Sequence, residues 1–356
     1  MNLKMFLLAF LFHWSSFLLT AQQNDGAAGK LNRYQASSIS ALADKIKLTH
    51  SQPQQRYEAA YQWVAHNIRY SLTESNSQSR SLSQAEITER AFSRRKAVCE
   101  GYAGLLDSLA QLMEIRTELV SGYTRLLGQI DPTPHVWLAV QLDGKWLLSD
   151  PTFGAGVLVN NKFVQEYNPE FLLVTPEKMI RSHMPYDPLW QFLASPVTHE
   201  GFILKKTQLN WKDYYQHHTD SLSRFLQLDL NDQYQAEYNR LERQTHQYEA
   251  VVLRMNFLIQ ALEIARHNET VKLINHISAT FNEAVGAYNN YASSFNEQQR
   301  QGKGKVKLNE LQKASILLDS CEKMLLNGRY PPELIDEAKT IQQSLFEFQQ
   351  KVRDAR

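Results

Sequence analysis

The chain has 356 residues, a formal net charge of +1 and a hydrophobic content of 43%. This length allows two ordinary domains, and the apolar content excludes wholesale disorder. Because acidic and basic residues nearly balance, we expect no nucleic acid as a partner. The chain has only two cysteines, Cys99 and Cys321. These are too few for the thiolate sets of structural zinc sites, so we expect no metal and no cofactor.

The N-terminus has the pattern of a secretory signal peptide over residues 1–21. Lys4 precedes an apolar stretch from Met5 to Leu19, and the small residue Ala21 stands before a polar run. The alternative is a membrane anchor, but the stretch is short for a span of about 20 residues and contains polar side chains. We therefore predict cleavage near Ala21, a polar leader over residues 22–40, no stable membrane span, and a secreted or periplasmic protein.

The next segment, residues 41–203, is predicted to form one α+β domain. Apolar residues at helical spacing predict helices over 37–48, 52–70, 84–94 and 99–113. From Arg116 the pattern changes to short strands, over 117–123, 136–142, 145–149 and 163–167. Asp143-Gly144 lies between two of these strands and favours a two-residue hairpin turn. Helices followed by a mostly antiparallel sheet form an α+β arrangement.

The remainder, residues 204–356, is predicted to be an α-helical bundle or coiled-coil-like domain. Apolar residues from Tyr234 to Leu262 recur at alternating steps of four and three, which is a heptad seam held for about four heptads. Further helices are predicted over 268–297 and 306–326, and a last one from Pro331. Two interpretations stay open: an arm or platform that binds a protein partner or substrate, and a packed helical domain without such a role.

Cys99 has the surroundings of an activated thiol. It lies where an apolar helix is predicted to begin, and a helix N-terminus stabilises a thiolate. Gly101 and Gly104 leave one flank of that helix bare, which predicts close packing against the sheet. Cys321 instead lies at helical spacing among apolar residues, where a free cysteine packs as a small hydrophobe. A Cys99–Cys321 disulfide is the alternative that an oxidising compartment would permit.

The hairpin turn at residues 143–144 predicts that His135 and Asp150 share one face of the sheet. If the ladder continues beyond the turn, Asp150 lies opposite Trp137, and His135 lies opposite Thr152. His135 and Asp150 are then diagonal neighbours about 7 Å apart, a gap that their side chains can close. Asp150 could hydrogen-bond one imidazole nitrogen and leave the other free, which is the orienting role in a catalytic triad.

Acyl-transfer chemistry also requires donors for a developing oxyanion. The backbone N–H of Cys99 is one candidate, and removal of one such donor typically costs about 3 kcal/mol of barrier. Tyr70 is a candidate for the second donor. Trp63, on the same predicted helix, is expected to lie in the core.

Taken together, these motifs resemble the transglutaminase-like superfamily. The segments that carry the resemblance are Trp63–Tyr70, Val98–Ala103, Gly122-Tyr123, His135-Val136-Trp137, Asp143–Trp146 and Asp150–Gly156. Residues 171–190 resemble the kyphoscoliosis-peptidase-type branch of that superfamily. The chain departs from the usual pattern at Leu138, where the family has asparagine, and at Phe153, where it has tryptophan.

The resemblance implies a papain-like or transglutaminase-like core in which Cys99 is the nucleophile, His135 the general base and acid, and Asp150 the orienter. It implies an exported thiol enzyme acting on amide or peptide bonds of a protein or peptide, with cell-wall peptide as one candidate substrate. Water as the second reactant makes it a peptidase or amidase, and an amine makes it an acyltransferase. The alternative is a catalytically inactive fold that serves as a binding or scaffolding module through its helical domain.

Overall fold

The computed structural model describes residues 36–71, 82–126, 128–159, 162–205, 218–244, 248–302 and 304–355. The predicted signal peptide and most of the predicted leader lie outside these residues, so export stays a prediction. The described part of the chain forms two compact units. The first runs up to Gln227 and includes Asn239–Met255, and the second consists of Leu228–Tyr238 and Asn256–Arg356. Compact units are not in themselves domains, and the boundary at residues 203–204 also stays a prediction.

The first unit has the predicted order of helices followed by an antiparallel sheet. Its first elements are α2 (Ile39–Thr49), α3 (Pro53–Asn67), β1 (Arg69–Tyr70), α4 (Gln84–Arg94), β2 (Lys96–Ala97) and α5 (Cys99–Leu112). The strands that follow are β3 (Arg116–Leu126), β4 (Gln129–Leu142) and β5 (Lys145–Ser149), then α6 (Pro151–Ala155), β6 (Gly156–Val159) and β7 (Lys162–Gln165). Shorter elements complete it: η2 (Pro169–Phe171), α7 (Pro176–Met179), β8 (His183–Pro185), η3 (Pro188–Gln191), α8 (His199–Ile203) and α9 (His218–Phe225).

The main sheet has the strand order β5-β4-β3-β8, with each neighbouring pair antiparallel. The predicted hairpin register is confirmed, because Leu142 pairs with Lys145 and the ladder continues to Leu138 opposite Ser149. Asp143 and Gly144 have φ angles of 48° and 74°. Positive φ at both central residues is the conformation of the two-residue turn that Asp-Gly favours. The sequence therefore predicted this turn for the correct reason.

The ladder does not extend to Asp150, which corrects one prediction. Strand β5 ends at Ser149, and Asp150 is the N-cap of helix α6, with Pro151 in its first position. Aspartate at the N-cap and proline at the first helical position both favour a helix start. Asp150 therefore leaves the strand instead of pairing with Trp137, and Thr152 lies in α6 instead of opposite His135.

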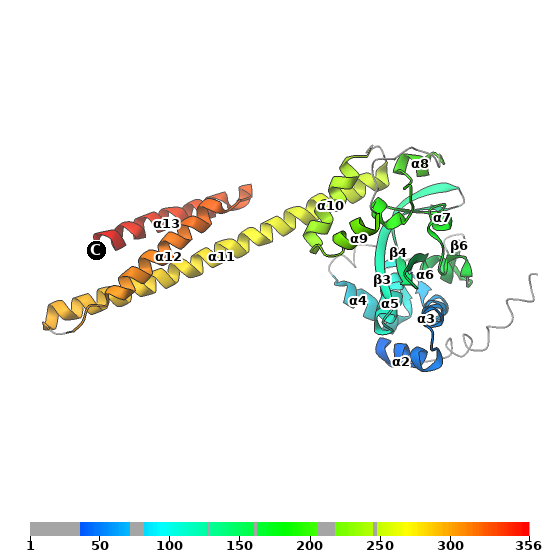
Figure 1. Ribbon diagram of the computed structural model, residues 1–356, viewed down its shortest axis with the longest axis horizontal. Helices are drawn as coiled ribbons and strands as arrows, with labels where there is room; N and C mark the ends of the chain where they lie inside the picture. Colours follow the sequence, from blue (N-terminus) through cyan, green and yellow to red (C-terminus); the bar gives the residue numbers. More distant parts are fainter. Residues whose placement is uncertain are drawn as a thin grey trace, which may run out of the picture. The chain divides into compact units, whose positions relative to one another are not determined.

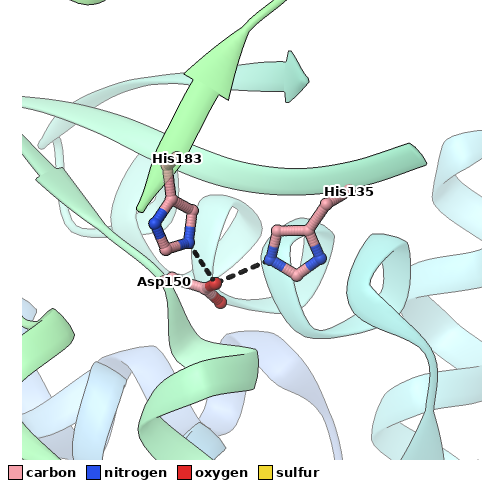
Figure 2. Close-up of side chains that lie close together, drawn as sticks. All are labelled: His135, Asp150 and His183. Carbon is pink, nitrogen blue, oxygen red and sulfur yellow. Dashed lines mark hydrogen bonds and ion pairs between the residues drawn. The ribbon is translucent and has the colours of Figure 1, made fainter. Parts of the chain in front are cut away.

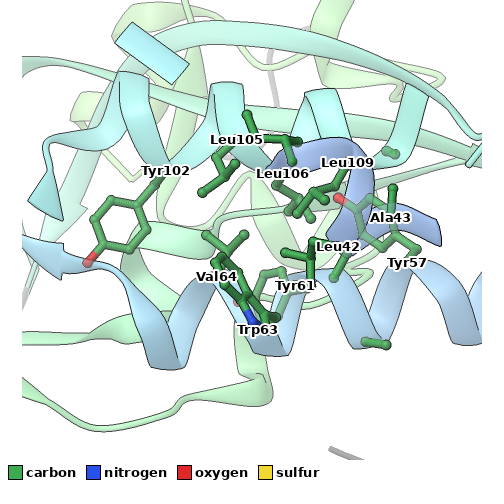
Figure 3. Close-up of a cluster of buried hydrophobic side chains, with 14 of the residues drawn as sticks. Leu42, Ala43, Tyr57, Tyr61, Trp63, Val64, Tyr102, Leu105, Leu106 and Leu109 are labelled. Atoms are coloured by element: carbon green, nitrogen blue, oxygen red, sulfur yellow. The ribbon is translucent and has the colours of Figure 1, made fainter. Parts of the chain in front are cut away.

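The main core of the first unit lies between the helices and one face of the sheet. Helix α5 packs on β3 and β4, and helices α2 and α3 pack on α5 (Figure 1). The aromatic and aliphatic side chains of these three helices interlock, and they include Leu42, Tyr57, Tyr61, Trp63, Leu105, Leu106 and Leu109 (Figure 3). Trp63 is fully buried, as predicted. A second cluster on the other face contains Val120, Trp137, Ala139, Leu148, Val174 and Met179.

Two local predictions around Cys99 are wrong. The helix predicted over 52–70 ends at Asn67, and Tyr70 lies on β1, where it pairs with Ala97 of β2 in parallel. The bare flank of α5 faces helix α4 and not the sheet. A Cβ added at Gly101 would meet Ala91 and Ala97, and one added at Gly104 would meet Gln84 and Thr88. The two glycines therefore permit the close approach of α4 to α5.

The C-terminal part of the chain is helical, as predicted. Its helices are α10 (Leu230–Glu242), α11 (Glu249–Gln301), α12 (Leu308–Asn327), η4 (Pro332–Leu334) and α13 (Ile335–Asp354). The predicted break before residue 268 is wrong, because α11 continues through it. The stretch 262–268 contains no proline or glycine that would end a helix. The heptad seam is instead interrupted where α10 ends at Glu242 and α11 begins at Glu249.

The second unit has its own apolar core, which α11, α12 and α13 share. Members of this core include Ile277, Ala284, Leu311, Leu318, Cys321, Leu345 and Val352. Cys321 is fully buried, so it fills space as a small apolar side chain. Both cysteines are free thiols. Within the described part of the chain, no helix combines the length and the apolar character that crossing a bilayer would require.

Gly122 is the point where β8 comes close to β3. It pairs with His135 of β4 on one side and with Pro185 of β8 on the other. A Cβ at this position would collide with the Met184 carbonyl oxygen and with the Trp137 ring. The absence of a side chain at Gly122 therefore allows β8 to join the sheet.

We expect Gly122→Ala to destabilise the first unit by about 2 kcal/mol, because the added methyl group overpacks a buried strand crossing. Urea denaturation of the full chain, followed by tryptophan fluorescence, measures this. All six tryptophans precede residue 212, so the signal reports on the first unit. The wild type is the reference for the midpoint. An unchanged midpoint in Gly122→Ala would contradict the packing argument.

Candidate active site

The structure brings His135 and Asp150 into direct contact. His135 lies on β4 and is 9% exposed, and Asp150 is fully buried. His135 Nε2 lies 2.6 Å from Asp150 Oδ2 (Figure 2). A carboxylate only accepts hydrogen bonds, so Nε2 carries the proton in this contact. The other ring nitrogen of His135, Nδ1, is then left to interact elsewhere.

Asp150 is held at its place by the helix that it caps. Its Oδ1 accepts hydrogen bonds from the backbone N–H groups of Thr152 and Phe153, at 2.7 and 3.1 Å. Its own carbonyl oxygen accepts a hydrogen bond from the Tyr61 hydroxyl of α3, at 2.9 Å. The capping bonds use Oδ1 and leave Oδ2 for side chains. One aspartate therefore both starts α6 and orients His135.

A second histidine shares the same carboxylate oxygen. His183 of β8 is 1% exposed, and its Nε2 lies 3.0 Å from Asp150 Oδ2. Its Nδ1 lies 2.8 Å from Ser182 Oγ. Figure 2 shows the two imidazoles on either side of the Asp150 carboxylate. The sequence motifs include His183 only as part of a resembling segment, and no role was predicted for it.

Cys99 is the first residue of α5, so its backbone N–H belongs to the unpaired first turn of a helix. The side chain is 8% exposed. It lies close enough to His135 to help raise the pKa of that imidazole. The structure therefore places all three predicted site residues in one connected group, with His135 between Cys99 and Asp150. Their catalytic roles stay predictions.

Opposite charges dominate the electrostatics of the group. Burial alone would lower the pKa of His135, but the charge and hydrogen bond of Asp150, together with Cys99, raise it to about 10. Burial would raise the pKa of Asp150, but the two histidines hold it well below its ordinary value. The pair is therefore an imidazolium and a carboxylate at neutral pH. Burial lowers the pKa of His183, and the charge of His135 acts in the same direction, so His183 is neutral.

Aromatic rings enclose the two histidines. Trp137 and Phe153 lie 6.1 and 5.1 Å from the His135 ring, measured between ring centroids. The His183 ring has Trp137, Phe153 and Phe171 at 5.1, 4.9 and 5.6 Å. Phe153, where the resembling family has tryptophan, thus fills a place beside both imidazoles. These rings keep water away from the carboxylate, and a low local dielectric strengthens its hydrogen bonds.

His135, Asp150 and His183 are also the described residues that could hold a metal ion, since their ligand atoms lie within 4.8 Å of one another. Metal–nitrogen and metal–oxygen bonds of about 2.1 Å in tetrahedral geometry would separate the ligand atoms by about 3.4 Å. The observed separations from Asp150 Oδ2, 2.6 and 3.0 Å, are hydrogen-bond lengths. The arrangement fits a hydrogen-bonded group better than a metal site.

Comparison with known proteins finds a family model and relatives that match part of the chain. Residues 40–151 match the family model of the transglutaminase-like superfamily. Human kyphoscoliosis peptidase is 30% identical over an alignment of 172 residues, which covers 45% of this chain and 25% of that protein. The chain thus spans a quarter of the length of this relative.

Solved structures with some likeness include one described as a TGase, with 19% identity and a TM-score of 0.27, covering 44% of this chain and 41% of that one. Another is the periplasmic domain of TgpA from Pseudomonas aeruginosa, with 23% identity and a TM-score of 0.26. It covers 35% of this chain and 46% of that one.

We expect Asp150→Asn to lower the pKa of His135 well below about 10, because Cys99 alone then opposes the effect of burial. The asparagine oxygen still caps α6, so the fold should persist. NMR titration of the His135 ring in both proteins measures the shift, and unchanged signals from buried His199 serve as the fold control.

The same shift predicts a pH dependence of stability. The pKa of His135 is higher in the folded chain than in the unfolded one, so its stabilisation is complete below about pH 6.5 and is lost as the pH rises towards about 10. The wild-type urea midpoint should therefore fall over this range more steeply than that of Asp150→Asn. A His135 that titrates at the same pH in both proteins would refute the ion pair.

Proposed function

Because residues 40–151 carry a domain of the transglutaminase-like superfamily, we propose that this chain is a thiol enzyme that cleaves or transfers amide bonds through an acyl-enzyme intermediate. The observation that carries the proposal is the connected group of Cys99, His135 and buried Asp150. A nucleophile, a base beside it, and an orienter of that base are the parts of a cysteine-based triad.

In the proposed reaction, the Cys99 sulfur attacks the carbonyl carbon of the substrate amide. A C–S bond forms, and the carbonyl electron pair moves to oxygen. The His135 imidazolium then gives its proton to the leaving nitrogen, the C–N bond breaks, and a thioester remains. Neutral His135 next takes a proton from water or from an amine as that reactant attacks the thioester. The C–S bond breaks, the acyl product leaves, and Cys99 is again a thiolate beside the His135 imidazolium. Asp150 stabilises the imidazolium throughout and keeps its ring oriented.

Two donors are proposed for the oxyanion. One is the backbone N–H of Cys99 at the start of α5. The other is the hydroxyl of Tyr70, which is half-buried on β1 and close enough to Cys99 to experience its charge. Burial and the Cys99 charge raise the pKa of Tyr70 to about 12. The hydroxyl therefore keeps its proton at neutral pH and can donate it to an oxyanion.

The proposed substrate is a protein or peptide, and hydrolysis is proposed over amine transfer. Human kyphoscoliosis peptidase, the relative with 30% identity, is named a peptidase. We further propose an exported protein. This part rests on the sequence pattern of residues 1–21, with a basic residue, an apolar stretch and a small residue in the order of a signal peptide.

The thiol assignment predicts selective alkylation of Cys99 by iodoacetamide at pH 6. An ordinary thiol is protonated at this pH and reacts slowly, whereas a thiolate paired with an imidazolium reacts. Peptide mass spectrometry of the full chain measures the labelling of each cysteine. Buried Cys321 is the internal control, and His135→Ala should abolish the labelling of Cys99. Equal labelling of both cysteines, and only under denaturant, would overturn the assignment.

The oxyanion assignment predicts that Tyr70→Phe slows acylation by about 100-fold. p-Nitrophenyl acetate is a suitable probe, because its burst of nitrophenol and the gain of one acetyl group on Cys99 report the acyl-enzyme directly. Iodoacetamide provides the matched control reaction. Its attack occurs at a saturated carbon and creates no oxyanion, so alkylation of the same variant should keep the wild-type rate. A parallel loss in both reactions would show that Tyr70 acts on the thiol and not on the oxyanion.

A further inference from the structure

We propose that His183 is a positioning residue of this site, which holds the Asp150 carboxylate in the orientation that His135 requires. The inference rests on the proposed thiol chemistry of Cys99, and it assigns to β8 a part in that chemistry. His183 does not touch the reacting atoms in this proposal. It acts through Asp150.

The first support is the set of hydrogen bonds around Asp150. From the described residues, Oδ1 accepts the N–H groups of Thr152 and Phe153, and Oδ2 accepts Nε2–H of His135 and of His183. A carboxylate offers about four lone-pair positions. Each oxygen therefore has two donors, and the group cannot rotate without breaking at least one charge-assisted bond. Without His183, Oδ2 would be held by His135 alone.

The second support is the protonation pattern that these contacts require. Asp150 is an anion, so His183 must carry its proton on Nε2 to donate to it. Its Nδ1 is then an acceptor, and it lies 2.8 Å from Ser182 Oγ, which can donate its hydroxyl proton. The Asp150 carboxylate therefore fixes the tautomer of His183, and the Ser182 hydroxyl can serve the acceptor that this tautomer leaves at Nδ1. A continuous series of donors and acceptors thus runs from Ser182 through His183 and Asp150 to His135, which lies beside Cys99.

The third support is the packing that fixes the His183 ring in place. Its residue pairs with Thr124 of β3, and Trp137 and Phe153 pack against the ring at 5.1 and 4.9 Å. The two imidazole rings lie 5.7 Å apart, with the carboxylate between them (Figure 2). A neutral His183 stabilises the Asp150 anion by a hydrogen bond, and it does not compete with His135 for the positive charge.

The direct test uses the unmodified full chain. ¹⁵N NMR of labelled protein between pH 6 and 8 reports the tautomer and charge of each histidine ring. The expected result is a neutral His183 protonated at Nε2 and a positively charged His135. A His183 protonated at Nδ1, or positively charged, would overturn the proposal, because neither form fits the chain of contacts from Ser182 to Asp150.

The functional test compares His183→Phe with His183→Gln. Phenylalanine keeps the ring packing but removes the donor, so iodoacetamide alkylation of Cys99 at pH 6 should fall by about tenfold, which corresponds to one charge-assisted hydrogen bond. The pKa of His135 should fall with it. Glutamine places an amide N–H near the position of Nε2, so it should restore most of the alkylation rate and most of the pKa of His135. His199→Phe is the matched control.

His199 is equally buried, with ring nitrogens 3.1 Å from the Tyr123 hydroxyl and 3.1 Å from the Tyr186 carbonyl oxygen. His199→Phe should therefore change neither the alkylation rate of Cys99 nor the pKa of His135. If His183→Phe fails to fold by tryptophan fluorescence, Ser182→Ala provides the second variant, and it should leave His183 protonated at Nε2 in the NMR measurement, because Asp150 requires a donor there. A His183 that moves its proton to Nδ1 in Ser182→Ala would also count against the proposal.

The outcomes separate this inference from the proposed function. A wild-type chain whose Cys99 does not react at pH 6 refutes the thiol enzyme, whatever the state of His183. If Cys99 of the wild type reacts, and if His183→Phe keeps the wild-type alkylation rate and the wild-type pKa of His135, the proposed enzyme remains supported and the positioning role is refuted. If the alkylation rate of Cys99 falls equally in His183→Phe and His183→Gln while the pKa of His135 is unchanged, His183 has a packing role only.

Discussion

The structure of the site depends on one buried carboxylate, that of Asp150. An ionised group without solvent is costly unless every lone pair meets a donor. The donors here come from three separate parts of the chain: the first turn of α6, His135 on β4 and His183 on β8. The position of each is therefore constrained by the same charge. The same anion also sets the charge of its neighbour, because the raised pKa of His135 depends on Asp150.

This dependence explains why the sheet order matters for the chemistry. Strand β8 joins the edge of β3, and Gly122 at the contact pairs with His135 and with Pro185 at once. The strand that carries His135 and the strand that carries His183 are thus aligned across a single residue. A shift of β8 along β3 would move His183 away from Asp150, so register and electrostatics are coupled at this point.

Much of this arrangement could be predicted from local sequence signals, and the rest required long-range contacts. Asp143-Gly144 predicted the hairpin register, and the apolar run after Cys99 predicted α5. The contact of His135 with Asp150 was predicted from a strand ladder, but it forms through a helix cap. The Asp150-Pro151 pair could have indicated that cap, because both residues favour a helix start. His183 carries no such local signal. Its place follows from β8 docking on β3, and pairing between distant segments is not encoded in any short window.

The part played by Asp150 as the cap of α6 has a consequence for partly folded forms of the protein. The residues of the proposed site are spread over positions 99 to 183, and they meet only when α6 has formed and β8 is in the sheet. A chain that lacks either element keeps its cysteine but lacks the ion pair that sustains the proposed reactivity. The proposed reactivity of the thiol would therefore report the folding of the first unit. An incompletely folded molecule would be protected from harmful side reactions by the same geometry that makes the native one competent.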